Sequence, residues 1–193
     1  MTKKVSKIRF RATLYRSTTT AKVGSRIILS LPKNVSAKLP SRGMTSVEGT
    51  INEFPFQATL EPDGQGSHWL RVDRKMQKAI GSDAGDVVKL EITPVQEEPE
   101  PKVPADLQKV LVANPKALAL WSDITPIARR DWIQWITSAK QLETRAHRIK
   151  NTCSMLATGK RRVCCFDRSG IYSKSFNNPI ANDKSNKKDT KNS

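Results

Sequence analysis

The apolar residues of this sequence change their spacing across one short segment, residues 96–104, which reads QEEPEPKVP. Three prolines and three glutamates among these nine residues cannot continue a sheet or build a core, so a stiff, extended linker is predicted. Apolar and polar residues alternate before this segment, as in strands, whereas apolar residues recur at helical spacing after it. The chain is therefore expected to be α+β, with an all-β unit followed by an all-α unit.

The residues before the linker predict a small closed β-barrel over residues 5–95. Apolar side chains alternate from Ile8 to Leu14, so Arg9 and Arg11 are expected to point to the opposite face of that strand. Closure suits short strands separated by turn signals because it removes exposed strand edges. Further strands are predicted at 27–31, 47–51, 54–60, 68–72 and 87–92, with a short helix at 74–80 that ends at Gly81.

Two positions in the barrel half carry specific expectations. Asn52 and Glu53 separate two predicted strands and have the length of a two-residue hairpin turn. Glutamate suits a positive φ poorly, so the turn is predicted to be longer or strained. His68 alternates with Leu70 and Val72 and is therefore expected to face the barrel interior or its rim as a hydrogen-bonded structural residue.

The residues after the linker predict a helical unit over residues 105–172. Two short helices are expected at 105–113 and 115–121, with a break between them at Asn114. Thr125 followed by proline predicts the start of a third helix, which continues to about residue 139. The predicted apolar stripe of the last helix is Leu142, Ala146, Ile149, Cys153 and Leu156, with Gly159 at its end.

The net charge of +16 arises from 34 basic and 18 acidic residues and is unevenly distributed. Eleven cations precede the first acidic side chain, Glu48, and residues 125–176 carry eleven cations against three acids. Residues 48–95, by contrast, carry five cations and eight acids. Two basic blocks favour an anionic partner: a nucleic acid, an acidic protein face or anionic lipid. The alternative is a basic composition that serves no specific partner.

The sequence predicts a cytoplasmic protein without an integral membrane segment. No run approaches the roughly 18 apolar residues of a membrane helix, and the basic N-terminus lacks the apolar stretch of a secretory signal. Three cysteines, an odd number, indicate reduced thiols. Residues 173–193 are predicted to form a disordered basic tail, because Ile180 is the single large aliphatic residue after residue 176.

No complete set of catalytic or metal-binding residues is evident. Cys164 and Cys165 are adjacent, which suits tetrahedral zinc poorly, and their arginine neighbours mark them as oxidation targets rather than a catalytic pair. His68 and His147 lie in different predicted units, and there is no phosphate-binding glycine loop or nucleophile elbow. We therefore expect no catalytic residue, cofactor or metal. A small-molecule enzyme using His68 and the barrel cavity is the third alternative.

A basic cluster on the last helix and its exit is the candidate partner-binding site. Arg145, Arg148 and Thr152 follow helical spacing and are expected on the face opposite Ile149 and Leu156. Arginines in such a cluster can hold carboxylate or phosphate groups through paired hydrogen bonds. The predicted anion-binding residues are Arg145, Arg148, Lys160, Arg161 and Arg162.

Two structural explanations compete with this site. Cations after a helix end interact favourably with the helix dipole, so Lys160 and its neighbours can serve as capping residues alone. The helix can also present a solvated face with local salt bridges, for example from Glu143 to His147 or Lys150.

Residues 138–162, SAKQLETRAHRIKNTCSMLATGKRR, resemble the YdeI/OmpD-associated family, also called bacteriocin-protection. The family's A-K-x-x-E-T-R-x-x-R-I run is present from Ala139 to Ile149, and its M-L-x-x-G-K run follows from Met155 to Lys160. The barrel half resembles the domain of unknown function that often precedes this family, in VEGTIN at 47–52, GQGSH at 64–68 and GDV at 85–87. The sequence departs from the family at Gln141-Leu142, where Arg-Pro is usual, and at Glu53, where glycine is usual.

The resemblance implies a double-split β-barrel, related to AbrB-like DNA-binding barrels, joined to a small helical domain. It implies no established catalytic residue. The family name connects it with envelope porins and with resistance to cationic antimicrobial peptides. A chain of net charge +16 repels cationic peptides, so any such protection is expected to be indirect.

Together these observations predict a non-enzymatic cytoplasmic binding or stress-response protein. It is expected to dock an acidic protein surface or another polyanion through its basic surfaces. Nucleic-acid binding through an AbrB-like barrel is the alternative, which rests on analogy of fold. The sequence indicates neither the identity of the partner nor the oligomeric state.

Overall fold

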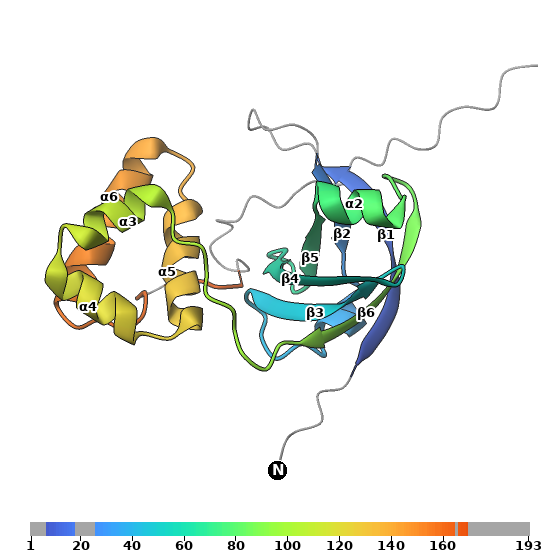
Figure 1. Ribbon diagram of the computed structural model, residues 1–193, viewed down its shortest axis with the longest axis horizontal. Helices are drawn as coiled ribbons and strands as arrows, with labels where there is room; N and C mark the ends of the chain where they lie inside the picture. The colour runs from blue at the N-terminus through green and yellow to red at the C-terminus, as the bar shows by residue number, and fades with distance from the viewer. Residues whose placement is uncertain (1–6, 18–25, 165, 170–193) are drawn as a thin grey trace, which may run out of the picture. The chain divides into compact units, whose positions relative to one another are not determined.

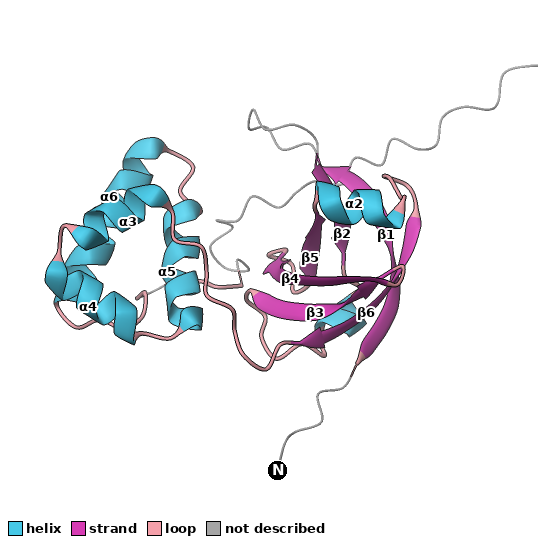
Figure 2. Cartoon of the chain, viewed as in Figure 1, coloured by secondary structure: helices cyan, strands magenta, loops and turns pink. Residues whose placement is uncertain are grey.

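The computed structural model describes residues 7–17, 26–164 and 166–169. Described residues up to Val95 form a β-barrel unit, and Gln96–Arg168 form a helical unit (Figure 1). Strands occur in the first unit and the longer helices in the second (Figure 2), so the predicted α+β class is confirmed. The predicted tail at 173–193 lies outside the described residues. In the described part of the chain, no helix has the length and apolar character needed to cross a membrane.

The barrel is a closed antiparallel sheet, as predicted. Its strands follow the order β1-β2-β5-β4-β3-β6, and β6 closes the barrel by pairing with β1. Each predicted strand is present, and the boundaries differ from the expected ones by a few residues. The strands are β1 (Ile8–Ser17), β2 (Arg26–Ser30), β3 (Thr45–Ile51), β4 (Phe54–Pro62), β5 (His68–Val72) and β6 (Val87–Pro94).

Two strands change partner along their length, which gives the barrel its split form. The first part of β1, residues 8–13, pairs with β6, and residues 14–17 pair with β2. In β4, residues 54–60 pair with β3, and residues 61–62 pair with β5. Because β1 pairs with β6, Arg11 comes to lie directly opposite Lys89.

The hairpin between β3 and β4 has the two-residue turn that the sequence predicts. Ile51 pairs with Phe54, and the two turn residues, Asn52 and Glu53, have φ angles of 42° and 70°. Two positive φ values define a type I′ turn, which matches the twist of the flanking strands. Asparagine tolerates this conformation, whereas a glutamate there is strained, as expected.

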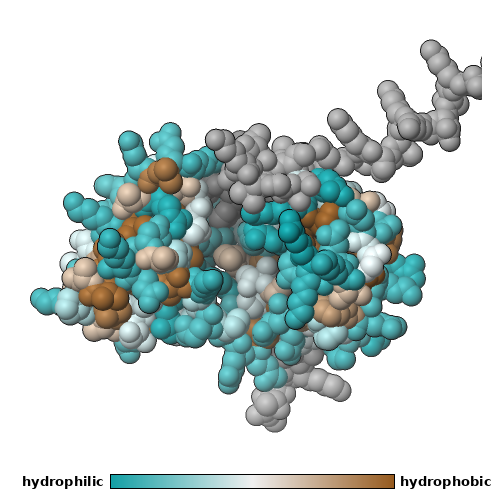
Figure 3. Space-filling model, turned by 45° about the horizontal axis from the view of Figure 1, so that its top comes forward, coloured by the Kyte–Doolittle hydropathy of each residue, from teal (hydrophilic) through white to brown (hydrophobic). Residues whose placement is uncertain are grey.

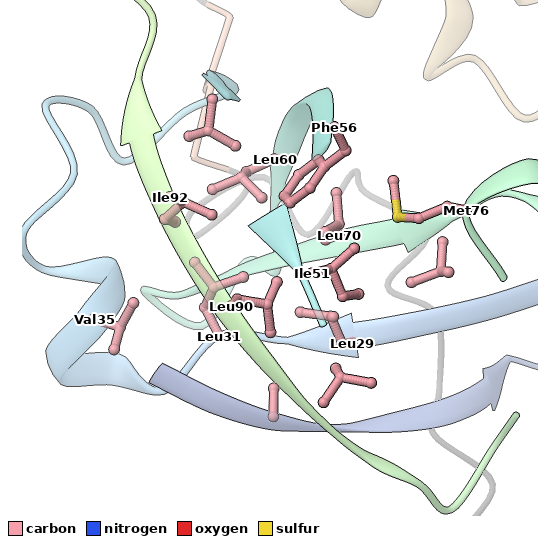
Figure 4. Close-up of a cluster of buried hydrophobic side chains, with 14 of the residues drawn as sticks. Leu29, Leu31, Val35, Ile51, Phe56, Leu60, Leu70, Met76, Leu90 and Ile92 are labelled. Carbon is pink, nitrogen blue, oxygen red and sulfur yellow. The ribbon is translucent and has the colours of Figure 1, made fainter. Parts of the chain in front are cut away.

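Alternating apolar side chains fill the barrel, and two short helices contribute to its core. Figure 4 shows Val35 of α1 (Lys33–Ser36) and Met76 of α2 (Arg74–Ile80) on opposite sides of this cluster. The sequence predicts α2, whose N-terminus is capped by the Asp73 side chain and whose end has Gly81 at φ 61°. The single-turn helix α1 was not predicted, because Pro32 indicates only the end of a strand.

The helical unit consists of α3 (Ala105–Val112), α4 (Pro115–Asp123), α5 (Pro126–Thr137) and α6 (Leu142–Ala157). The predicted break at Asn114 is confirmed, and its side chain accepts a hydrogen bond from the Ala117 N–H at 3.1 Å. Thr125 caps α5 in the same way, through the Ala128 N–H. Trp132 is fully buried at the centre and packs edge-to-face against Trp135, with ring centroids 6.0 Å apart.

The predicted apolar stripe of α6 is wrong at its first two positions. Leu142 is 86% exposed and Ala146 is also exposed, whereas Ile149, Cys153 and Leu156 are buried. The buried face is rotated toward Thr152, which is fully buried, and toward the half-buried Arg145 and Arg148. The expectation that these three residues lie opposite Ile149 and Leu156 is therefore wrong. Residues 145, 149, 152 and 156 follow the spacing of one helix face.

The Pro/Glu segment at 96–104 contains no helix or strand, but its glutamates bind the helical unit. Glu98 pairs with Arg130 of α5, and both side chains are almost buried. Glu100 accepts a hydrogen bond from Arg129 of the same helix at 2.8 Å. The segment is therefore held along α5 by successive ion pairs.

Candidate functional site

The first predicted anion-binding residue, Arg145, has a carboxylate partner inside the helical unit. Its Nε donates to one oxygen of Asp106 at 2.7 Å and its Nη2 donates to the other at 3.0 Å. This paired hydrogen bonding lowers the pKa of the Asp106 carboxyl and joins α6 to the first turn of α3. The bidentate site that the sequence predicts for an external anion is thus taken by an internal one.

Arg148 contacts the end of α5. Its guanidinium donates to the Trp135 backbone carbonyl and, at 3.0 Å, to the Ser138 hydroxyl. The guanidinium carbon lies 5.3 Å from the centre of the Trp135 ring, within the range of a cation–π interaction. These contacts satisfy carbonyl and hydroxyl groups at the C-terminus of α5, a position where positive charge is favourable.

The three cations after α6 lie in different environments. Gly159, at φ 88°, ends the helix, and the N–H groups of Gly159 and Lys160 donate to the Leu156 and Met155 carbonyls, as in a Schellman motif. Arg161 donates to the Asp123 carboxylate at 2.6 Å and to the Asp123 carbonyl at 3.1 Å. The Lys160 and Arg162 side chains are exposed.

The five predicted residues therefore do not form one cradle. Arg145, Arg148 and Arg161 each bind a different helix: α3, α5 and the end of α4. Arg145 and Arg161 make ion pairs inside the helical unit, with Asp106 and Asp123, and these differ from the Glu143 pairs that the sequence suggests. Among the described contacts, His147 bonds Asn151 rather than Glu143. An anion-binding role of the cluster stays a prediction.

His68 faces the barrel interior, as the alternation predicts, and is 1% exposed. Its Nε2 lies 2.8 Å from the Gly43 carbonyl, which can only accept, so Nε2 carries the proton. Nδ1 then accepts from the Ser36 hydroxyl at 2.6 Å. Burial lowers the pKa of His68, which keeps the imidazole neutral. Because Ser36 is only 4% exposed, this Ser–His pair is closed to a substrate and locks the loop between α1 and β3.

We expect the stability of the barrel to fall as the pH drops below about 6.5. The unfolded chain takes up a proton on His68 there, whereas the folded imidazole, with its lowered pKa, does not. The loss has a slope of up to about 1.4 kcal/mol per pH unit. Urea unfolding of the wild type and of His68→Gln from about pH 7.5 to about pH 5 measures it. Identical pH dependence of the two proteins would contradict the assignment.

The cysteines and carboxylates of the described residues form no metal centre. Within those ranges, no group of three or more His, Cys, Asp or Glu side chains is placed to hold a metal ion. Cys153 is buried, as predicted, and burial raises the pKa of its thiol. Cys164 is exposed, and Cys165 lies outside the described residues.

Two carboxyl groups, the half-buried Glu61 and the buried Asp131, have a raised pKa, and in both the largest cause is burial. For Glu61, burial outweighs the opposing effect of Arg71 and Arg26. For Asp131, burial outweighs the opposing effect of its neighbouring arginines, of which Arg168 lies 3.5 Å away. Neither residue lines the grooves described next. Burial explains the raised pKa of both carboxyl groups, so neither indicates a reactive site.

A basic groove lies on the outer surface of the barrel, over β1 and β6 at the β3–β4 hairpin. It has a volume of about 610 Å³, and its charged lining consists of Arg9, Arg11, Lys89, Glu53 and Glu91. Arg11 and Lys89 lie directly opposite each other on neighbouring strands, and both side chains are exposed. Neither makes an ion pair among the described residues. Like charges directly opposite each other in a sheet are destabilising, so folding alone does not explain this pair.

The other two cations of this surface, Lys7 and Arg9, share one carboxylate partner. Glu91 accepts from Lys7 and from Arg9, each at 2.6 Å, and these hydrogen bonds lower the pKa of its carboxyl. The hairpin turn fixes the position of Lys89, because Asn52 exchanges hydrogen bonds with the Lys89 backbone through its N–H and its side-chain oxygen. We call the opposed, unneutralised cations Arg11 and Lys89 the basic pair.

In the space-filling view, hydrophilic side chains cover most of the visible face of the barrel unit, and hydrophobic residues form small separate patches (Figure 3). On this face the barrel unit therefore presents charged and hydrogen-bonding groups rather than one large apolar patch.

Two family descriptions match separate parts of this chain. Residues 100–159 match the family described as Bacteriocin-protection, YdeI or OmpD-Associated. The helical unit belongs to this family. Residues 10–92 match Domain of unknown function (DUF1905), so the barrel is the DUF1905 domain that precedes it. The chain matches no curated protein. The resemblance drawn from the residues is confirmed in both halves.

In this chain, the arginines of the YdeI/OmpD-associated motif make structural contacts. Arg145 and Arg148 stand in its E-T-R-x-x-R run, and both join helices of the same unit. The sequence predicts only one member of the basic pair. Alternation along β1 predicts that Arg11 points outward, but the apposition of Lys89 depends on the closure of the barrel by β6.

Proposed function

We propose that this protein is a non-enzymatic, cytoplasmic binding protein that docks an acidic partner at the basic pair of its barrel. The supporting observation is the direct apposition of Arg11 and Lys89, exposed and without a carboxylate partner among the described residues. An external carboxylate or phosphate relieves the repulsion between the two cations and gains two charge-assisted hydrogen bonds. The barrel holds both on neighbouring strands, so little ordering is needed on binding.

The proposal also covers the protection named in the family description. A chain of net charge +16 repels cationic peptides and cannot act by sequestering them. Protection against antimicrobial peptides or bacteriocins then acts through the acidic partner that the barrel binds. Because the proposal specifies the partner only by its negative charge, an acidic polymer serves as the probe.

We expect Arg11→Gln combined with Lys89→Gln to weaken binding of poly-L-glutamate about tenfold at low salt, because two exposed charge contacts are lost. Isothermal titration calorimetry measures the affinity. The matched control is Lys75→Gln with Lys78→Gln, which removes the same charge from exposed positions on α2.

The control pair is expected to change the affinity less than twofold. Equal weakening by the two double variants would mean that poly-L-glutamate responds only to net charge, and the proposed docking site would then be wrong. Circular dichroism spectra of both variants verify that the fold is retained.

A further inference from the structure

A second groove adjoins the first on the outer surface of the barrel. It also has a volume of about 610 Å³, and the two grooves share Thr50 and Glu91 in their linings. Lys7 and Glu48 add the charges of the second groove. The two grooves adjoin at these shared residues and together cover parts of the outer face of β1, β6, β3 and β4.

The charges of this groove are arranged in successive rows across the strands. The basic pair forms one row, and the next row holds Arg9 opposite Glu91. One row further, Glu48 of β3 lies opposite Thr93 of β6. Glu48 is exposed and has no ion-pair partner among the described residues. The hairpin end therefore has two cations, Arg11 and Lys89, with the single carboxylate of Glu53 in the same lining, and the other end has the carboxylate of Glu48.

The spacing between these positions matches an extended peptide. Lys89 and Thr93 are four residues apart on β6, which corresponds to about 13 Å along a strand. In an extended chain, side chains four positions apart point to the same face and are separated by the same distance. An acidic side chain and a basic side chain at this spacing can reach the basic pair and Glu48 together.

Resting on the proposed function, we infer that the occupant is an extended polypeptide segment with an acidic residue and, four positions away, a basic residue. Charge complementarity favours this occupant over a nucleic acid, whose uniform row of phosphates meets Glu48 and Glu53 within the same groove. Exposed ion pairs add little affinity, so the charge pattern acts mainly by rejecting wrong partners. The binding is therefore selective rather than tight.

The test uses two short synthetic peptides that differ at one position. The first carries aspartate and, four residues later, lysine; the second carries aspartate at both positions. We expect the wild type to bind the first peptide about fivefold more tightly at low salt, measured by amide chemical-shift titration. The Glu48→Lys variant is expected to reverse this preference. The control, Glu143→Lys on α6, makes the same charge change at an exposed position and is expected to keep it.

The outcomes separate this inference from the proposed function. If Glu48→Lys leaves the preference unchanged while removal of the basic pair abolishes binding of both peptides, the two-charge occupant is wrong and the acidic-partner docking site stands. If neither peptide binds, or if random duplex DNA binds more tightly and displaces both, the peptide occupant is also wrong.

Discussion

Replacing Gly49 with alanine is expected to destabilise the barrel by about 3 kcal/mol, which is near the upper end for overpacking. A Cβ at this position would lie 1.9 Å from the backbone oxygen of Glu91, far inside contact distance. Gly49 lies between β4 and β6, opposite Phe56 and Ile92, so neither neighbouring strand can move without breaking its ladder. Native-state hydrogen exchange of the β3 and β6 amides measures the loss in the barrel itself.

The control is Thr50→Ala, at the next position of the same strand, where a change of less than about 0.5 kcal/mol is expected. A stable Gly49→Ala variant with unchanged exchange rates would show that the β6 backbone at Glu91 does not approach Gly49 of β3 as closely as described. Because β6 carries Lys89 and Glu91, such a result would also remove the geometric basis of the groove.

Replacing Arg148 with alanine is expected to destabilise the helical unit by about 2 to 3 kcal/mol. The variant loses the contact with the Trp135 ring and the charged hydrogen bonds to the Trp135 carbonyl and the Ser138 hydroxyl, and only the bond from that hydroxyl to that carbonyl is left. Three of the four tryptophans belong to this unit, so urea unfolding followed by tryptophan fluorescence reports mainly on it.

Arg148→Lys separates the hydrogen bonding of Arg148 from its stacking on Trp135, because lysine keeps a charged donor but loses the planar stacking. An intermediate loss of stability is expected. The exposed Arg162→Ala variant is the matched control, with an expected change below about 0.5 kcal/mol. If Arg148→Ala were as stable as the control, the arginine would be available to an external anion, as the sequence suggests.

The fold was predictable where local patterns decide it. Alternation in β1, the turn signals, Gly81, the break at Asn114 and the cap at Thr125 locate the strands and helices to within a few residues. The short helix α1 was missed because one turn gives no periodic signal. The buried face of α6 was misassigned because long arginine side chains can bury their stems when their charge is satisfied, as Asp106 satisfies Arg145.

The candidate site was predictable only in part, because it depends on pairing between distant segments. The charge pattern indicates a basic first block, and alternation predicts that Arg11 points outward. Strand register decides the rest, and no local pattern reveals it. It places Lys89 opposite Arg11, pairs Arg9 with Glu91 and leaves Glu48 without an ion pair among the described residues. The helical cluster looked more suitable because its arginines are close in sequence, yet their partners are distant residues of the same unit.

The most direct test of the docking site is a map of the backbone amides that respond to poly-L-glutamate in a two-dimensional NMR titration of the full chain. Saturable shifts are expected around Arg11 and Lys89 on β1 and β6, with residues 145–162 unaffected. Shifts confined to residues 145–162, with β1 and β6 silent, would contradict the account and return the site to the helical unit.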